Sequence, residues 1–236
     1  LLDALEQSGQ ADNTIVVVYS DHGMEFFEHD TWGQGNSAIG DHSARIPLII
    51  KGPGVAPQGV VPDVVRSIDI APTLLEYAGI EAPANKMTGR SLEPVLSGTA
   101  EATYAPEDAI GMEVSGNSAV LKGRWKITRN QKPHGDGQWR LFNLDNDPGE
   151  TADMAAAHPE IFSQLQADYA AYAARVGVLE VPAGYNSVSQ VQKNMTAAVL
   201  KRSMPKMIAL GIGAIILLGG VVWFGLNIRR GLKKKA

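Results

Sequence analysis

The chain has 236 residues, enough for one or two domains, and a formal net charge of −4 at pH 7. It contains no cysteine, which excludes disulfides, cysteine zinc sites and a cysteine nucleophile within these residues. All 25 acidic residues lie before residue 193, so an acidic region is followed by a purely basic tail. This asymmetry argues against a nucleic-acid partner and favours anionic lipid headgroups beside the tail.

The first part of the chain has the pattern of an αβ unit. Residues 1–5 resemble the end of an amphipathic helix already under way, and the first residue is not Met. We therefore expect the chain to be the C-terminal part of a longer protein. Residues 14–19 are a continuous β-branched run, which predicts a buried parallel strand. Residues 46–50 predict a second short strand that ends at the Gly-Pro-Gly turn of residues 52–54.

A helix is predicted over residues 67–78. Ser67 or Asp69 is a suitable N-cap, and Pro72 fits the first turn because its missing N–H costs nothing there. Gly79 is the expected stop. As an N-cap, Asp69 is a structural residue rather than a metal ligand.

The later elements follow a different pattern, typical of a small antiparallel sheet. Residues 119–121 and 125–128 flank the turn-forming residues 122–124 and predict a hairpin. Residues 139–144 predict a further strand, and residues 159–175 predict a helix with one apolar face.

A run of 22 residues without charge, 207–228, predicts a transmembrane helix. At about 1.5 Å per residue it can cross a hydrocarbon core of about 30 Å. Trp223 lies near one end, where an indole sits at the headgroup level, and basic residues flank both ends. The alternative is a buried core helix. The slight excess of positive charge after the span favours a cytoplasmic C-terminus.

The tripeptide Asp21-His22-Gly23 carries the clearest chemical signal. It follows the strand of residues 14–19 directly, and ligands in open α/β sheets bind outside the carboxyl ends of strands. A carboxylate beside an imidazole suits a divalent metal, and Gly23 allows a sharp turn there. Taken alone, Asp21 is equally suited to capping a helix.

The surrounding segments are more specific in combination than the tripeptide. They resemble, in the same order, segments of the sulfatase family of the alkaline phosphatase superfamily, over about residues 1–175. The segments are residues 20–25, 28–29, 32–35, 45–54, 67–79, 89–92, 121–127 and 141–151.

The resemblance implies a domain organisation. Residues 1–110 would be part of an alkaline-phosphatase-like α/β domain, with a mixed sheet and flanking helices. Residues 111–175 would form a small C-terminal subdomain with an antiparallel sheet and a helix. A linker (176–206), the transmembrane helix (207–228) and a basic tail (229–236) would follow. The family's nucleophile and two acidic metal ligands belong to an N-terminal half and have no match here, so we expect this chain alone to be inactive.

The resemblance also implies site residues. Asp21 and His22 would bind the metal, with Ca²⁺ as the first expectation and Mg²⁺, Mn²⁺ or Zn²⁺ as alternatives. Many relatives place a Lys against the transferred group where this chain has Gln34, which can donate a hydrogen bond but carries no charge. His42 or Arg45 could supply the missing cation. Gln34 and His42 are therefore the catalytic candidates, and Arg45 is the substrate-binding candidate.

Simpler interpretations remain open for several of these residues. His29 and His42 are both compatible with ordinary polar loop residues, although His42 lies just before the second strand. Arg45 could serve only to orient that loop through salt bridges.

Three functions follow from the resemblance. The first is a membrane-anchored sulfuric ester hydrolase with its catalytic domain outside the cytoplasm, in the periplasm, as sulfatases are usually exported. The second is a phosphoesterase, phosphonate monoester hydrolase or phospho-group transferase of the same superfamily. The third is a non-catalytic, membrane-tethered binding domain. The expected partners are a sulfate or phosphate ester and a lipid bilayer.

Overall fold

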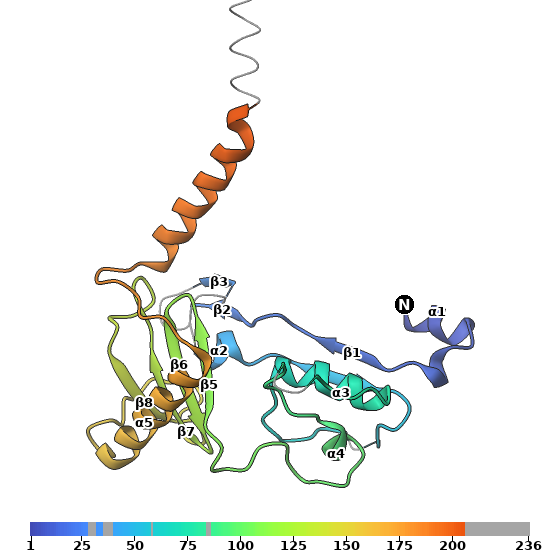
Figure 1. The fold of residues 1–236 in the computed structure, drawn as a ribbon. Helices are drawn as coiled ribbons and strands as arrows, with labels where there is room; N and C mark the ends of the chain where they lie inside the picture. Colours follow the sequence, from blue (N-terminus) through green and yellow to red (C-terminus); the bar gives the residue numbers. More distant parts are fainter. Residues whose placement is uncertain (28–31, 35–39, 58, 84–85, 206–236) are drawn as a thin grey trace, which may run out of the picture. The chain divides into compact units, whose positions relative to one another are not determined.

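The computed structural model describes residues 1–27, 32–34, 40–57, 59–83 and 86–205. Figure 1 draws these residues as a ribbon. The chain divides into two units, residues 1–184 and 185–236. The first unit contains α1 (Leu2–Gln7), β1 (Val16–Tyr19), β2 (Met24–Phe26), β3 (Trp32–Gln34), α2 (Asp41–Ala44), β4 (Leu48–Lys51), α3 (Ile70–Tyr77), α4 (Glu93–Leu96), β5 (Ile110–Val114), β6 (Asn117–Lys122), β7 (Trp125–Arg129), β8 (Trp139–Asn143) and α5 (Pro159–Val176).

Strands β1 and β4 form a two-stranded antiparallel sheet in which Val16 pairs with Lys51. The prediction of two strands is confirmed, but the prediction that the first is parallel and buried is wrong for the described residues. Val18 and Tyr19 are 55% and 51% exposed, and Ile49 is 61% exposed. An apolar, β-branched run favours extended backbone in either direction, so the direction depends on which strand it meets.

The predicted helix of residues 67–78 is present as a 3₁₀ turn, Ser67–Asp69, followed by α3. Gly79 ends it with a φ of 66°, a left-handed conformation that glycine adopts without strain. Helix α3 is held to α4 by the Thr73 hydroxyl, which accepts a 2.8 Å hydrogen bond from the Leu92 backbone N–H.

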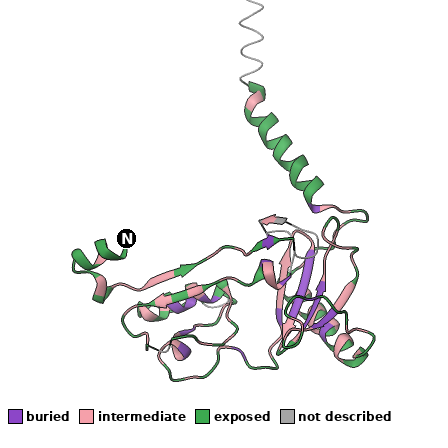
Figure 2. Ribbon diagram, turned by 180° about the vertical axis from the view of Figure 1, so that it is seen from behind, coloured by how far each residue is buried: buried purple, intermediate pink, exposed green. Residues whose placement is uncertain are grey.

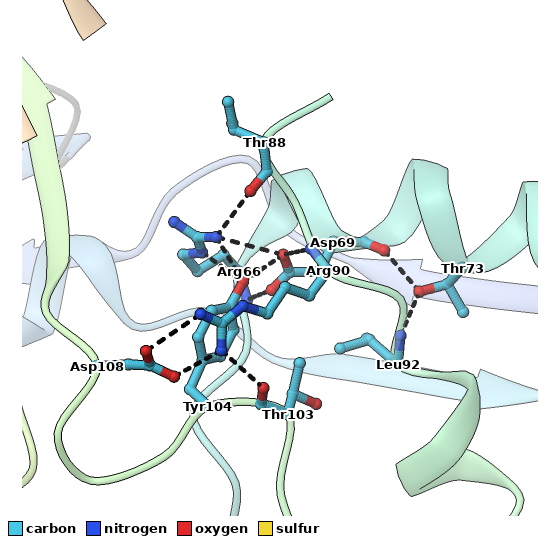
Figure 3. A network of polar contacts seen from close by, with 9 residues as sticks. All are labelled: Arg66, Asp69, Thr73, Thr88, Arg90, Leu92, Thr103, Tyr104 and Asp108. Atoms are coloured by element: carbon cyan, nitrogen blue, oxygen red, sulfur yellow. Dashed lines mark hydrogen bonds and ion pairs between the residues drawn. The ribbon is translucent and has the colours of Figure 1, made fainter. Parts of the chain in front are cut away.

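The Asp69 carboxylate lies at the centre of a polar network (Figure 3). It accepts hydrogen bonds from the backbone N–H of Arg66 at 2.7 Å and of Arg90 at 2.9 Å, and from the Tyr104 hydroxyl at 2.6 Å. The bond to Arg66 is part of a capping box at the start of the 3₁₀ turn, in which Arg66 is the N-cap and Asp69 the third residue. At the start of α3 the Asp69 side chain makes no cap bond, so the N-cap role predicted for it is wrong, and its structural role lies in this network. The same side chain also joins three segments that are distant in the sequence.

Strands β5, β6, β7 and β8 form an antiparallel sheet in chain order, with α5 packed against it. The predicted hairpin, strand and helix of this region are confirmed, whereas β5 was not predicted. Gly123, with a φ of 53°, forms the tight turn between β6 and β7. Its core is built from Val120, Ile127, Leu141 and Leu165, which lie on β6, β7, β8 and α5. Several buried stretches of the chain lie in this sheet (Figure 2).

The second unit is described up to residue 205, and residues 187–205 are helical. These helical residues lie within the segment expected to be a linker, residues 176–206. Asn186 caps the helix by accepting a 2.9 Å hydrogen bond from the Ser189 backbone N–H. The sequence did not single out this cap, because the neighbouring residues are also polar. Among the described residues, no helix is both long and apolar enough to cross a bilayer. The predicted transmembrane helix (207–228) and basic tail (229–236) lie outside the described residues.

Candidate metal and substrate site

The turn between β1 and β2 carries Asp21 and His22. The side chain of Asp21 is 86% exposed, whereas that of His22 is 20% exposed. The Ser20 hydroxyl donates a 2.7 Å hydrogen bond to the His22 carbonyl, and Oδ1 of Asp21 accepts one from the His22 backbone N–H at 3.1 Å. These local bonds fix the turn and leave the carboxylate facing solvent.

The ring of His22 is held in an orientation suited to metal binding. Its Nδ1 lies 2.7 Å from the Gly23 carbonyl oxygen. Because a carbonyl can only accept, Nδ1 carries the proton and, in the neutral ring, Nε2 keeps its lone pair. That nitrogen lies 3.7 Å from Oδ2 of Asp21. A histidine ligand that donates its other N–H to a backbone carbonyl is the usual arrangement around a bound metal.

These two side chains fit part of a metal site. No group of three or more His, Asp or Glu side chains converges within the described residues. Asp21 and His22 thus offer one carboxylate and one imidazole, and a complete coordination sphere would need further ligands.

Gly23 brings this turn against α2. Its backbone N–H donates a 2.8 Å hydrogen bond to the Ser43 carbonyl, and a Cβ at this position would lie 2.1 Å from the carbonyl oxygen of His42. The close approach of another backbone is therefore a reason for the glycine that the sequence did not indicate.

His42 is held in place rather than free in a loop. It lies on α2, with Nε2 3.5 Å from Oε1 of Glu25 and its side chain only 15% exposed. Glu25 is 4% exposed and accepts a 2.6 Å hydrogen bond from the Ser43 hydroxyl. A ring fixed beside a buried carboxylate differs from the ordinary loop histidine considered above. His29, the other loop histidine, lies outside the described residues.

Gln34 and Arg45 occupy different surroundings. The backbone of Gln34, in β3, pairs with Met24 of β2, which places it next to the turn that carries His22. Arg45 follows α2, and its backbone N–H binds the Asp41 carbonyl at 2.8 Å. Its side chain is exposed and forms no ion pair with a described residue, so the salt-bridge alternative finds no support there.

A buried ion-pair cluster next to His42 was missed from the sequence. Lys126 on β7 is 1% exposed, and its Nζ lies 2.7 Å from Oε1 of Glu150 and 3.3 Å from Oδ1 of Asp41. The same Glu150 oxygen accepts a 2.8 Å hydrogen bond from the Asp41 backbone N–H. The cluster therefore ties the start of α2 to the C-terminal sheet. The sequence offered one signal for this cluster, a lysine inside the predicted strand of residues 125–128. If such a lysine is buried, it needs an acidic partner.

A cavity of about 430 Å³ lies beside this cluster. Its wall combines α2 with the ends of β7 and β8 and the loops next to them. It is lined by Gly40, His42, Thr128, Asn130, His134, Gly135, Arg140, Phe142, Glu150, Thr151 and Asp153.

Comparison with known proteins identifies the family of this chain. Residues 36–173, more than half of the chain, match the family described as N-sulphoglucosamine sulphohydrolase, C-terminal. Arylsulfatase K of Xenopus laevis is 30% identical over 179 residues, which cover 70% of this chain and 32% of the relative.

Two solved structures show the same fold. A 2-O GAG sulfatase superposes with a TM-score of 0.65 and is 28% identical. The match covers 77% of this chain and 42% of the sulfatase chain. The phosphonate monoester hydrolase SpPMH from Silicibacter pomeroyi superposes with a TM-score of 0.60 and is 27% identical. The match covers 74% of this chain and 37% of the hydrolase chain. The chain thus spans less than half the length of these proteins. It belongs to the N-sulphoglucosamine sulphohydrolase C-terminal family and corresponds to the C-terminal part of a sulfatase with the alkaline-phosphatase-like fold.

Proposed function

We propose that this protein is a metal-dependent sulfuric ester hydrolase anchored in a membrane. The observation that carries the proposal is the Asp21–His22 pair. Its imidazole donates Nδ1–H to a backbone carbonyl and directs Nε2 toward the neighbouring carboxylate. This arrangement is the one typical of metal-bound histidines, whereas a helix-capping Asp needs no such histidine.

Each residue of the site has a proposed role. Asp21 and His22 hold the metal, which when bound would polarise the oxygens of the transferred group. His42, fixed beside Glu25, is suited to hold or release a proton at the ester oxygen. Gln34 would donate an uncharged hydrogen bond to the transferred group, and the exposed Arg45 would attract the anionic substrate.

The identity of the metal is open to direct measurement. The resemblance to sulfatases favours Ca²⁺, a hard cation that prefers oxygen ligands. The imidazole of His22 also suits Mn²⁺ or Zn²⁺. Metal analysis of the purified protein distinguishes these ions.

The experiment that tests the proposal compares Asp21→Ala with His158→Ala. Both variants would be made in the product of the complete gene. His158 is the N-cap of α5, and the centroid of its ring lies 4.9 Å from that of Trp125. We expect Asp21→Ala to lose bound metal and at least about 10²-fold in turnover of 4-nitrophenyl sulfate, the scale for losing one electrostatic stabiliser. His158→Ala should retain both.

Circular dichroism shows whether each variant is folded. If a folded Asp21→Ala protein keeps its metal and near-normal turnover, Asp21 is not a ligand and the proposed metal site is wrong. The isolated 236-residue chain should show no turnover above background.

A second candidate function is hydrolysis of phosphonate or phosphate esters. The likeness to SpPMH supports it, and so does Gln34 in a position where many sulfatases have a Lys. The ratio of kcat/KM for 4-nitrophenyl sulfate and 4-nitrophenyl phenylphosphonate decides between the two activities. Absence of both activities in a metal-loaded protein would favour a non-catalytic binding domain.

Membrane anchoring rests on the sequence of residues 207–228 and the basic residues around them. We propose that the enzymatic domain lies in the periplasm and the C-terminus in the cytoplasm. Protease added to spheroplasts should remove the domain and spare a C-terminal tag. Protection of the domain would reverse this topology.

A further inference from the structure

The helix of residues 187–205 exposes an apolar stripe. Every residue from 188 to 202 is exposed, as the colouring of this helix in Figure 2 shows. The stripe consists of Val188, Val191, Met195 and Val199, which are 41, 50, 63 and 65% exposed. These residues follow one another at spacings of three or four positions, so they lie on one side of the helix. Several apolar side chains side by side in water favour contact with an apolar partner.

The opposite side of this helix is polar. Ser189, Lys193 and Thr196 lie there, again at spacings of three or four positions. A helix with one apolar and one polar side is suited to the boundary between water and an apolar phase. It is unsuited to burial on all sides, because its polar side chains would lose their contact with water.

The charge of the helix indicates what kind of partner it meets. Its charged residues are Lys193, Lys201 and Arg202, and no acidic residue follows Glu180 in the chain. A helix with positive charge alone is attracted to a negatively charged surface. The surface of a membrane that contains anionic lipids offers this charge together with an apolar layer.

A second copy of the helix fits the stripe less well. Arg202 comes three positions after Val199 and therefore lies on the same side. Two parallel copies packed along the stripe would bring their Arg202 side chains together, and the helix has no carboxylate to compensate them. At a membrane surface, the long stem of Arg202 can follow the apolar layer while its guanidinium reaches the headgroups.

The end of the helix is compatible with a change of direction. Pro205 is its last described residue, and the uncharged run of residues 207–228 begins two positions later. Proline has no N–H for the helical hydrogen bond to the fourth residue before it, so a helix bends readily there. A helix that lies along a membrane can thus be followed closely by one that crosses it.

We propose that the helix of residues 187–205 lies along the surface of a membrane that contains anionic lipids, with the apolar stripe inserted among the lipids. Interfacial helices of this kind bury their apolar side about 5–10 Å into the boundary between headgroups and acyl chains. The inference rests on the membrane anchoring proposed above and adds to it a second membrane contact beside the predicted span.

The absence of cysteine allows single probes to be placed on either side of the helix. Val191→Cys and Met195→Cys place a fluorescent label on the apolar stripe, and Ser189→Cys and Thr196→Cys place it on the polar side. The labelled 236-residue chain is reconstituted into vesicles of phosphatidylcholine and phosphatidylglycerol. Lipids brominated on their acyl chains should quench the label at positions 191 and 195. Iodide in the buffer should quench it at positions 189 and 196.

A control probe distinguishes insertion of the helix from general adsorption of the protein. Val60→Cys labels an apolar residue of the first unit that is 93% exposed. Iodide should quench this label and brominated lipid should not. Circular dichroism shows whether each labelled protein is folded.

A charge variant tests the preference for anionic lipids. Lys193→Gln combined with Lys201→Gln should reduce the quenching of the Met195→Cys label by brominated lipid, and so should omission of phosphatidylglycerol. Lys51→Gln combined with Lys86→Gln is the matched control, because it removes two exposed lysines of the first unit. It should leave the quenching unchanged.

Three results would overturn the inference. Quenching by iodide at all four helix positions would show that the helix stands in water. Protection of positions 191 and 195 from both quenchers would show that protein covers the stripe, and dipolar coupling between spin labels at position 195 would identify a second copy. Equal lipid quenching with and without phosphatidylglycerol would contradict the requirement for anionic lipid.

A label at Leu217→Cys tests the predicted span separately. If brominated lipid quenches this label but not those at positions 191 and 195, only the interfacial helix is wrong. If it does not quench the Leu217→Cys label, the proposed membrane anchoring itself fails.

Discussion

The Tyr104 hydroxyl donates a 2.6 Å hydrogen bond to Oδ1 of Asp69, a carboxylate with no exposed surface (Figure 3). The Tyr104 ring lies close to two guanidinium groups, with the central carbons of Arg66 and Arg90 at 4.7 and 4.5 Å from its centroid. This arrangement connects the start of α3 to the segments around residues 90 and 104.

Tyr104→Phe should therefore destabilise the chain by about 1–3 kcal/mol, because it removes a donor from a buried carboxylate. The measurement is the midpoint of urea unfolding followed by circular dichroism. Tyr77→Phe is the matched control, since the Tyr77 hydroxyl makes only a long, exposed bond of 3.4 Å to the Gly54 carbonyl. Equal midpoints for the two variants would show that the bond to Asp69 contributes little.

The same phenol predicts a loss of stability at high pH. Burial, together with the hydrogen bond to Asp69, raises the pKa of Tyr104 to about 12 from its ordinary value of 10.0. A raised pKa in the folded state stabilises the fold fully below pH 10.0, and this contribution disappears as the pH rises toward about 12. The unfolding midpoint should fall over that window, and it should fall less in Tyr104→Phe. An identical pH profile in both proteins would contradict this assignment.

Lys126→Met should cost about 3–5 kcal/mol of stability, because removal of one partner leaves the buried Glu150 charge uncompensated. Lys122→Met is the control. Its ion pair with Asp168, at 2.9 Å, is partly exposed, and such pairs contribute about 0–1 kcal/mol. Urea unfolding measures both variants.

A double variant separates loss of charge from loss of packing. Lys126→Met combined with Glu150→Gln removes both charges, so it should recover part of the stability lost in the single variant. If the double variant is less stable than Lys126→Met alone, charge compensation is not what Lys126 supplies.

Gly23→Ala should separate the turn that carries Asp21 and His22 from α2, because the added Cβ would lie 2.1 Å from the backbone carbonyl oxygen of His42. We expect reduced metal content and reduced turnover of 4-nitrophenyl sulfate in the product of the complete gene. Gly149→Ala is the matched control, since its Cβ would meet its nearest neighbour, a Thr151 methyl group, at an ordinary 3.5 Å. Normal metal binding by Gly23→Ala would show that the close approach is not needed.

Local sequence patterns predicted much of this fold. The β-branched run of residues 14–19 predicted β1, and the apolar periodicity of residues 159–175 predicted α5. Residues 122–124 predicted the β6–β7 turn, where Gly123 adopts a positive φ. These features succeed because strand propensity, helical periodicity and turn chemistry act over a few neighbouring residues. The antiparallel pairing of β1 with β4 was missed, because both directions place the same apolar side chains on the same faces.

The sequence by itself determined the family resemblance, the position of Asp21 and His22 after a strand, and the choice of His42 as a candidate. Only the tertiary structure decided the surroundings of these residues. The bond from the Asp41 backbone to Glu150 spans 109 positions, and the contact from Lys126 to Asp41 spans 85. A charged residue is ordinarily solvated, so its place inside a predicted strand does not by itself identify Lys126 as buried. Its burial depends on two carboxylates that only folding brings to it.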